Sequence, residues 1–261
     1  MTKKEYSVVV TGFGANLNAP YGNNTSNPSS LIARSLPHSL PPSHPLNPTD
    51  STITLVDGVA NDFAEIYGTY AKIRQRLRDL HAQYGTTVDL WVHLGRSPWP
   101  FVTVERKAFR QDFTSSWLGE DARKGYYNGP DNEKNSVNDI GPNPWLDVPM
   151  GLNTEIDVNA VVRDSNVNLA KGKDVLEVRS HLEAAAMGCG FCYYESLANC
   201  WVAGKRRDVL FCHVPRGVEE GDVEKGREAI LAVVGAAVKA IGEREGRSGE
   251  GDWKQEFGLE P

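Results

Sequence analysis

Met187-Gly-Cys-Gly-Phe-Cys-Tyr-Tyr-Glu-Ser-Leu-Ala-Asn-Cys-Trp201, followed by Val209-Leu-Phe-Cys-His-Val-Pro215, is the stretch around which the chain is organised. These two segments hold all four cysteines and one of the six histidines. The first has the pattern of a helix that starts near Cys189, and the second is a short apolar strand that ends at His213. Unsatisfied N–H groups at a helix N-terminus favour a thiolate, and a histidine on the next strand can take up the thiol proton. We therefore interpret the pair as a nucleophile and its base.

Strand-like and helix-like segments alternate along the rest of the chain. Apolar, β-branched runs predict strands over 7–11, 52–56, 87–93, 101–105, 174–178 and 209–214. Apolar spacing and capping signals predict helices over 29–36, from 62 to 84, over 157–163, around Tyr193 and Leu197, and over 219–244. This alternation predicts an α/β fold, a three-layer α/β/α sandwich around a twisted, mostly parallel sheet.

The simplest domain organisation is one α/β domain over residues 1–245 with a polar tail over 246–261. Five prolines predict an exposed excursion without a regular element over 37–48, and a polar composition predicts a long loop over 110–153. Gly12-Phe-Gly14 is expected to form a tight turn after the first strand. Ligands of open α/β sheets bind at the carboxyl ends of the strands, so we expect the site where Phe13, Gly95 and His213 end theirs.

The composition excludes several classes of function. The chain has 261 residues, 40% of them hydrophobic and 24% charged, and a formal net charge of -6. An acidic protein has no basic excess with which to neutralise phosphates, so we expect no nucleic-acid or membrane partner. A strand-like run follows the first residues directly, and four cysteines crowded into one region are not typical of a disulfide framework. We therefore expect free thiols and a cytoplasmic location.

Two motifs allow a cofactor interpretation. Gly12-Phe-Gly14 follows a strand, but a dinucleotide-binding G-x-G-x-x-G would have glycine where Leu17 stands. Cys189-Gly-Phe-Cys192 is a Cys-x-x-Cys that could serve as a redox pair or as half of a zinc site, with Cys200 and Cys212 or His213 as further ligands. We favour an interpretation without metal or cofactor, in which the cysteines other than Cys189 are buried apolar side chains. The carboxylate that would orient the histidine is left open among Glu105, Asp89 and Glu195.

Taken together, six short motifs resemble the pyroglutamyl-peptidase I family, also called pyrrolidone-carboxyl peptidases. These cysteine peptidases remove an N-terminal pyroglutamate. The motifs follow the family's order with similar spacing and run along nearly the whole chain: Val8-Val-Val-Thr-Gly-Phe13, Asn27-Pro-Ser29, His93-Leu-Gly95, Val102-Thr-Val-Glu-Arg-Lys-Ala108, Cys189-x-Phe-x-Tyr-Tyr-Glu-Ser-Leu197 and Phe211-x-His-Val-Pro215.

The resemblance implies a role for four residues. Cys189 matches the family's nucleophile, His213 the base and Glu105 the acidic partner of the base, while Phe13 matches a ring that the family places against the pyrrolidone. It implies an α/β peptidase that needs no metal or cofactor. The expected substrate is a peptide with an N-terminal pyroglutamate, and the expected class is a cysteine-type omega peptidase.

The departures from the family pattern lie around the expected pocket. The segment after Gly14 lacks the family's second phenylalanine, Met187-Gly188 replaces larger side chains, and the loop between Gly95 and Glu105 is about a residue shorter than in the family. These differences motivate a second hypothesis. In it, a pyroglutamyl-peptidase-like fold with an altered pocket is a non-cleaving binding protein or acts on a different small acyl substrate.

Overall fold

The computed structural model describes residues 4–15, 26–56, 65–114, 125–127, 129–172 and 174–248. Its helices and strands follow one another as β1 (Tyr6–Phe13), α1 (Pro28–Ser35), β2 (Ser39–Leu40), β3 (Ile53–Val56), β4 (Glu65–Ile66), α2 (Tyr70–Tyr84), β5 (Leu90–Arg96), β6 (Val102–Phe109), the 3-10 helix η2 (Val137–Ile140), β7 (Gly151–Asn153), α3 (Val158–Leu169), β8 (Val178–Glu183), α4 (Gly188–Val202), β9 (Val209–Val214) and α5 (Glu220–Ser248). None of the helices within these ranges is both long and apolar enough to cross a membrane.

The strands form one mixed sheet in the order β2-β3-β1-β5-β9-β6-β7, with β4 beside β1 and β8 beside β6. Strands β3, β4 and β5 pair with β1 in parallel, as do β9 with β5 and β8 with β6. β6 is antiparallel to β9 and to β7, and β2 is antiparallel to β3. The expected mostly parallel sheet is therefore confirmed, and β6 enters the site from the opposite direction to its neighbour β9.

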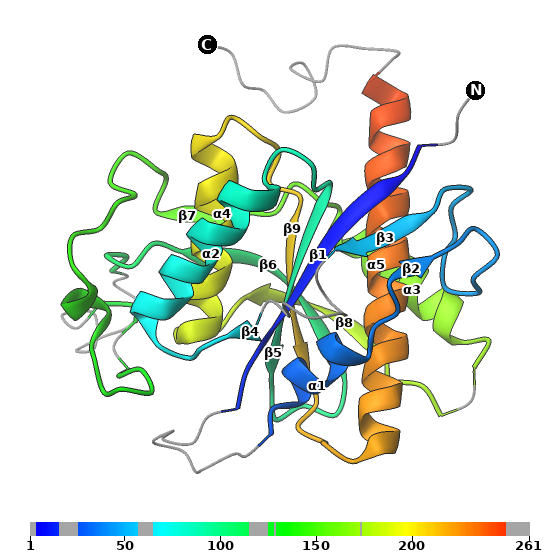
Figure 1. The fold of residues 1–261 in the computed structure, drawn as a ribbon, viewed down its shortest axis with the longest axis horizontal. Helices are drawn as coiled ribbons and strands as arrows, with labels where there is room; N and C mark the ends of the chain where they lie inside the picture. The colour runs from blue at the N-terminus through cyan, green and yellow to red at the C-terminus, as the bar shows by residue number, and fades with distance from the viewer. Residues whose placement is uncertain are drawn as a thin grey trace.

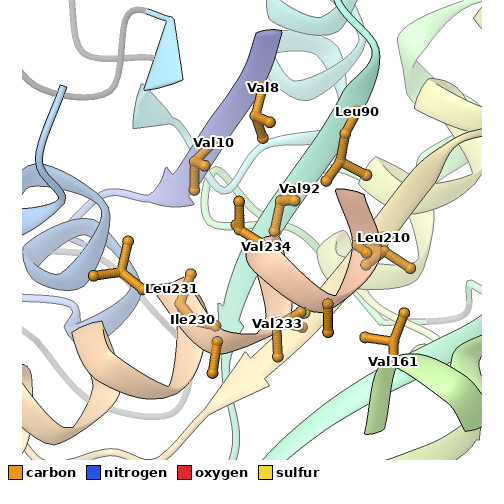
Figure 2. Close-up of a cluster of buried hydrophobic side chains, with 14 of the residues drawn as sticks. Val8, Val10, Leu90, Val92, Val161, Leu210, Ile230, Leu231, Val233 and Val234 are labelled. Atoms are coloured by element: carbon orange, nitrogen blue, oxygen red, sulfur yellow. The ribbon is translucent and has the colours of Figure 1, made fainter. Parts of the chain in front are cut away.

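Helices cover both faces of this sheet and give the expected three layers (Figure 1). Helices α1, α3 and α5 pack on one face, where valines and leucines of the central strands meet the apolar side of α5 (Figure 2). Helices α2 and α4 cover the other face. Since every other side chain of a strand points to the same face, Leu210 and Cys212 of β9 lie under α5 while Phe211 lies under α4. His213 follows the same alternation onto the face of α4.

The N-terminal elements differ from the sequence expectation at two points. Gly12 and Phe13 do not form a turn but continue β1, because they pair with β4, and Gly12 also pairs with Leu94 of β5. Glycine is required at position 12 by close packing, since a Cβ there would lie 2.3 Å from the Ser29 carbonyl oxygen. The predicted helix α1 is confirmed, with Asn27 as its N-cap. The 37–48 segment contains the short strand β2, so the expectation that it holds no regular element was wrong.

Strand pairing also overrides two local patterns further along the chain. The apolar spacing that predicts a helix from position 62 includes Ile66, which instead lies in β4 against Phe13; α2 begins only at Tyr70, after the N-cap Thr69, and position 62 itself lies outside the described residues. The strand predicted over 174–178 lies at Val178–Glu183, where it pairs with β6. In each case, hydrogen bonding to a neighbouring strand determines where the element lies.

Candidate active site

Cys189 lies in the first turn of α4. The N-cap residue of this helix is Met187, whose side chain makes no capping hydrogen bond. The amides of Gly190 and Phe191 donate to the carbonyls of Ala185 and Met187, whereas those of Gly188 and Cys189 have no backbone acceptor within the described ranges. Two free N–H groups and the positive end of the helix dipole therefore lie beside a partly exposed thiol.

His213 lies next to this thiol and is held by a carboxylate on its other side. Its Nδ1 atom is 2.7 Å from Oε1 of Glu105, and Cys189 lies close enough to the ring to raise its pKa. Glu105 is fully buried and His213 is 5% exposed. The three predicted residues Cys189, His213 and Glu105, which come from α4, β9 and β6, thus meet, with His213 between the thiol and the carboxylate.

The environment of His213 favours its protonated form. Burial by itself lowers the pKa of this imidazole, but the hydrogen bonds and negative charges of Cys189 and Glu105 outweigh burial and raise the pKa to about 10. At neutral pH the imidazolium form of His213 is therefore favoured.

We predict that the His213 ring titrates far above an ordinary histidine. Its proton signals, followed by NMR across alkaline pH, should give a pKa near 10, and the Cys189→Ala variant should give a much lower pKa because burial remains while one anion is lost. A pKa near the model-peptide value of about 6.5 in both proteins would contradict this arrangement.

Gly95 provides the space in which the thiol lies. It is paired with His213 across β5 and β9, and a Cβ at this position would lie 3.0 Å from Sγ of Cys189 and 2.9 Å from the Phe211 ring. The backbone φ angle at Gly95 lies outside the left-handed region that favours glycine, so the conformation does not require this residue. Glycine is required here for space beside the Cys189 thiol.

We predict that Gly95→Ala displaces the thiol and slows its alkylation by iodoacetamide by about 10²-fold, because a misplacement of an ångström is enough for such a loss. The reaction can be followed at neutral pH by mass spectrometry of the Cys189 peptide. Gly221→Ala is the matched control, since nothing lies within 4 Å of a Cβ there. Equal alkylation rates in both variants would show that Gly95 does not shape the site.

The buried Glu105 carboxylate is hydrogen-bonded to three side chains: His213, described above, Thr103 and His181. Thr103 Oγ1 donates to Oε1 at 2.7 Å, and His181 Nδ1 lies 2.7 Å from Oε2. The backbone carbonyl of Glu105 also accepts a hydrogen bond from the Tyr193 hydroxyl at 3.1 Å. Sequence reasoning missed Thr103 and His181. The period of two along β6 could have indicated Thr103, but His181 depends on the pairing of β6 with β8.

The other two carboxylates left open by the sequence lie elsewhere. Glu195 forms a buried ion pair with Arg74 at 2.7 Å, and Arg74 also donates to Gln111. Asp89 accepts from the Ser7 amide at the far end of β5. Glu105 is therefore the one of the three that contacts His213.

The remaining cysteines are poor nucleophiles. Burial raises the pKa of Cys192 and of Cys212 well above the ordinary value, and raises the pKa of Cys200 to about 12. All four cysteines of the chain are free. No group of three or more His, Cys, Asp or Glu side chains in the described part of the chain is arranged to hold a metal ion.

Phe13 is buried at the end of β1 and its ring reaches the start of α4. A Cβ built on Gly188 would lie 3.8 Å from Cε1 of Phe13 and 3.3 Å from Cδ1 of Ile73. The ring therefore lies beside the residue that precedes Cys189. Met187, one position earlier, is 43% exposed.

A cavity of about 580 Å³ lies where α2 and α4 end, beside the beginnings of the central strands β5 and β9. Its lining includes His81 and Cys200. Burial lowers the pKa of His81 to about 3 and raises the pKa of Cys200 to about 12, so both are neutral at pH 7. His81 and Cys200 therefore do not form a reactive thiol–imidazole pair, and we place the candidate site at Cys189.

Comparison with solved structures identifies the fold. The structure is similar to the pyrrolidone carboxyl peptidase from Thermococcus litoralis, with a TM-score of 0.64 at 17% sequence identity over 92% of this chain and 96% of that chain. The chain has the pyrrolidone carboxyl peptidase fold. A mutant pyrrolidone carboxyl peptidase from Pyrococcus furiosus gives a TM-score of 0.60 at 18% identity, covering 91% of this chain and 99% of that chain.

The pyroglutamyl peptidase I from Bacillus amyloliquefaciens is similar as well, with a TM-score of 0.58 at 19% identity over 90% of this chain and 96% of that chain. No protein-family model matches the sequence, and a search of curated proteins finds no match. The fold expected from the sequence resemblance is thus confirmed by structure, at 17% to 19% sequence identity to these three proteins.

Proposed function

We propose that this protein is a cysteine peptidase that removes the N-terminal pyroglutamyl residue from peptides. The observation that carries the proposal is the chain of interacting side chains from Cys189 through His213 to Glu105, in a pyrrolidone carboxyl peptidase fold. Such a chain is the arrangement that nucleophilic acyl transfer requires. The proposed enzyme acts in the cytoplasm and requires no metal or cofactor.

The reaction would begin with attack of the Cys189 thiolate on the pyroglutamyl carbonyl carbon. The carbonyl oxygen would gain negative charge, and the free amides of Gly188 and Cys189 would stabilise it as an oxyanion hole. Because these N–H groups belong to the backbone at a helix start, their direction does not depend on side-chain rotamers.

Collapse of the tetrahedral intermediate would require a proton for the leaving amine. The imidazolium of His213 would donate it as the C–N bond breaks, which leaves a thioester on Cys189. A water molecule would then attack the thioester, His213 would take the water proton, and the S–C bond would break to release pyroglutamate. Glu105 would hold the ring orientation through Nδ1 and stabilise its positive charge during the first step.

The pocket for the pyrrolidone ring would include Phe13 and the backbone around Gly188. A flat ring of this size can stack on the face or edge of an aromatic side chain. The surroundings of Gly188 support this assignment, since a Cβ at this position would lie 3.8 Å from the Phe13 ring. The small Gly188 leaves room where the resemblance implies a larger side chain.

The experiment that tests the proposal is hydrolysis of a pyroglutamyl fluorogenic amide by the purified protein. The matched control substrate is the corresponding prolyl amide, which has the same ring size but no ring carbonyl. We expect cleavage of the first only. Equal cleavage of both, or of neither, would reject pyroglutamate as the substrate; rapid alkylation of Cys189 without cleavage would instead favour a different small acyl substrate.

A further inference from the structure

The second oxygen of the buried Glu105 carboxylate is bound by another histidine. His181 Nδ1 lies 2.7 Å from Oε2 of Glu105 and 2.8 Å from the Glu183 carbonyl oxygen. Both partners are acceptors only. Nδ1 of His181 must therefore carry a hydrogen whether the ring is neutral or charged, so its role as donor to Glu105 is independent of its protonation state.

The sheet brings the two imidazoles to opposite sides of one carboxylate. Glu105 is paired directly with His181 across β6 and β8, while Thr103, two positions earlier on β6, is paired with His213 of β9. The site therefore extends by one residue beyond the predicted set: Cys189, His213, Glu105 and His181 form a continuous series. The His181 side chain is 41% exposed, whereas Glu105 is fully buried.

The His181 ring is also supported from its outer side. The ring of Trp99 lies against it at a centroid distance of 5.0 Å, and Trp99 in turn stacks on Phe101. The loop between β5 and β6 thus holds the imidazole against the carboxylate. A side chain that served only to fill space at this edge strand would not need a hydrogen bond from Nδ1 to a buried anion.

We propose that His181 is a positioning residue that fixes the Glu105 carboxylate in the orientation in which Oε1 faces His213. With Oε2 tied to β8 and Oε1 tied to Thr103 and His213, the carboxylate cannot rotate away from the imidazolium. This inference shares one element with the proposed function: His181 supports the formation of a thiolate at Cys189.

Other titratable groups lie near this series in the described part of the chain: Arg96 and Tyr70 interact electrostatically with Cys189, and Cys212 with Glu105. Tyr126 lies near enough to Glu105 and Glu183 that, with burial as the main cause, their charges raise the pKa of its hydroxyl. Lys107 is paired with Glu183 on the adjacent strand. The Tyr126 hydroxyl therefore stays protonated near neutral pH, and a change in the reactivity of Cys189 on substitution of His181 reports on the Glu105–His213 contact.

The test uses two substitutions that place an amide at different positions. The side-chain nitrogen of asparagine can occupy the position of Nδ1 of histidine, whereas that of glutamine occupies the position of Nε2. His181→Asn therefore retains the donor to Glu105 and His181→Gln removes it with little change in volume. His181→Ala removes both donor and volume, and His38→Ala, at an exposed histidine, is the control.

The measurement is the iodoacetamide alkylation rate of Cys189 between about pH 5 and 9, read by mass spectrometry. We expect His181→Gln and His181→Ala to react about tenfold more slowly near pH 6, the loss equivalent to one charge-assisted hydrogen bond, with the acid limb moved to higher pH. His181→Asn and His38→Ala should stay within about twofold of the wild type, since each retains every donor to Glu105.

Two results would overturn the proposal. One is a wild-type profile in His181→Gln; the other is equal slowing in His181→Asn and His181→Gln, which would assign His181 a packing role against Trp99. Because alkylation needs no substrate, the series decides the role of His181 even if the protein fails to cleave the pyroglutamyl amide. Failure of that cleavage alone would reject the proposed function and leave this inference standing.

Discussion

Cys189→Ala is expected to lower the kcat/KM for a pyroglutamyl fluorogenic amide by at least about 10³-fold, because the substitution removes the only atom that can form the thioester. Alanine retains the backbone amides of Gly188 and Cys189, so substrate binding should persist and the loss should appear in kcat. The residual rate would report what those amides contribute without a nucleophile. Initial rates under first-order conditions in substrate measure the effect.

Cys200→Ala is the matched control for this variant. Cys200 lies near the other end of the same helix, α4, where it is buried and where its raised pKa of about 12 keeps it a thiol. Activity should be retained in Cys200→Ala as long as the protein is folded, which circular dichroism can verify. Comparable activity in Cys189→Ala and the wild type would reject the mechanism altogether.

Glu105→Gln is the second substitution with a large expected effect. Glutamine retains the volume of this fully buried side chain but removes the charge that faces His213. Its amide NH₂ group also takes the place of one carboxylate oxygen, so a donor faces His181 or His213 where an acceptor stood. Loss of the anion should lower the pKa of His213 from about 10, since burial is then opposed by Cys189 alone. We expect kcat to fall by about 10³–10⁴-fold, as for a histidine whose orienting carboxylate is neutralised.

The same substitution should also destabilise the fold. Removing one member of a buried, hydrogen-bonded ion pair costs about 3–5 kcal/mol in the free energy of unfolding, measured by urea denaturation. Glu224→Gln is the control, because Glu224 pairs with Arg227 on the exposed side of α5 and such surface pairs contribute about 0–1 kcal/mol. If Glu105→Gln had the stability and activity of the wild type, Glu105 would have no part in the site.

The sequence alone supported the main parts of the fold because local patterns carried them. Asn27 before Pro28 marked the start of α1, and the apolar run from Val209 marked β9 with His213 near its end. Small residues before Cys189 marked the start of α4. These predictions required no knowledge of what each element packs against.

Predictions went wrong where a neighbouring element decided the outcome. Ile66 fits the apolar side of α2 by spacing, yet it lies in β4 because β1 offers it a parallel partner. Arg74 lies at the edge of the apolar stripe by the same count, but Glu195 and Gln111 on other elements bury it. A charged side chain is buried only when a partner is present, and a local pattern does not contain the partner.

The sequence by itself determined which residues make up the candidate site: a thiol at a helix start, a histidine at the end of the next strand and, through the family resemblance, a glutamate and a phenylalanine from earlier in the chain. The tertiary structure alone decided how they are held. β8 lies at Val178–Glu183 and pairs with β6, and this pairing brings His181 to Glu105. The reason is physical: spacing along one segment encodes which face is buried, whereas strand order and register arise from contacts between distant segments.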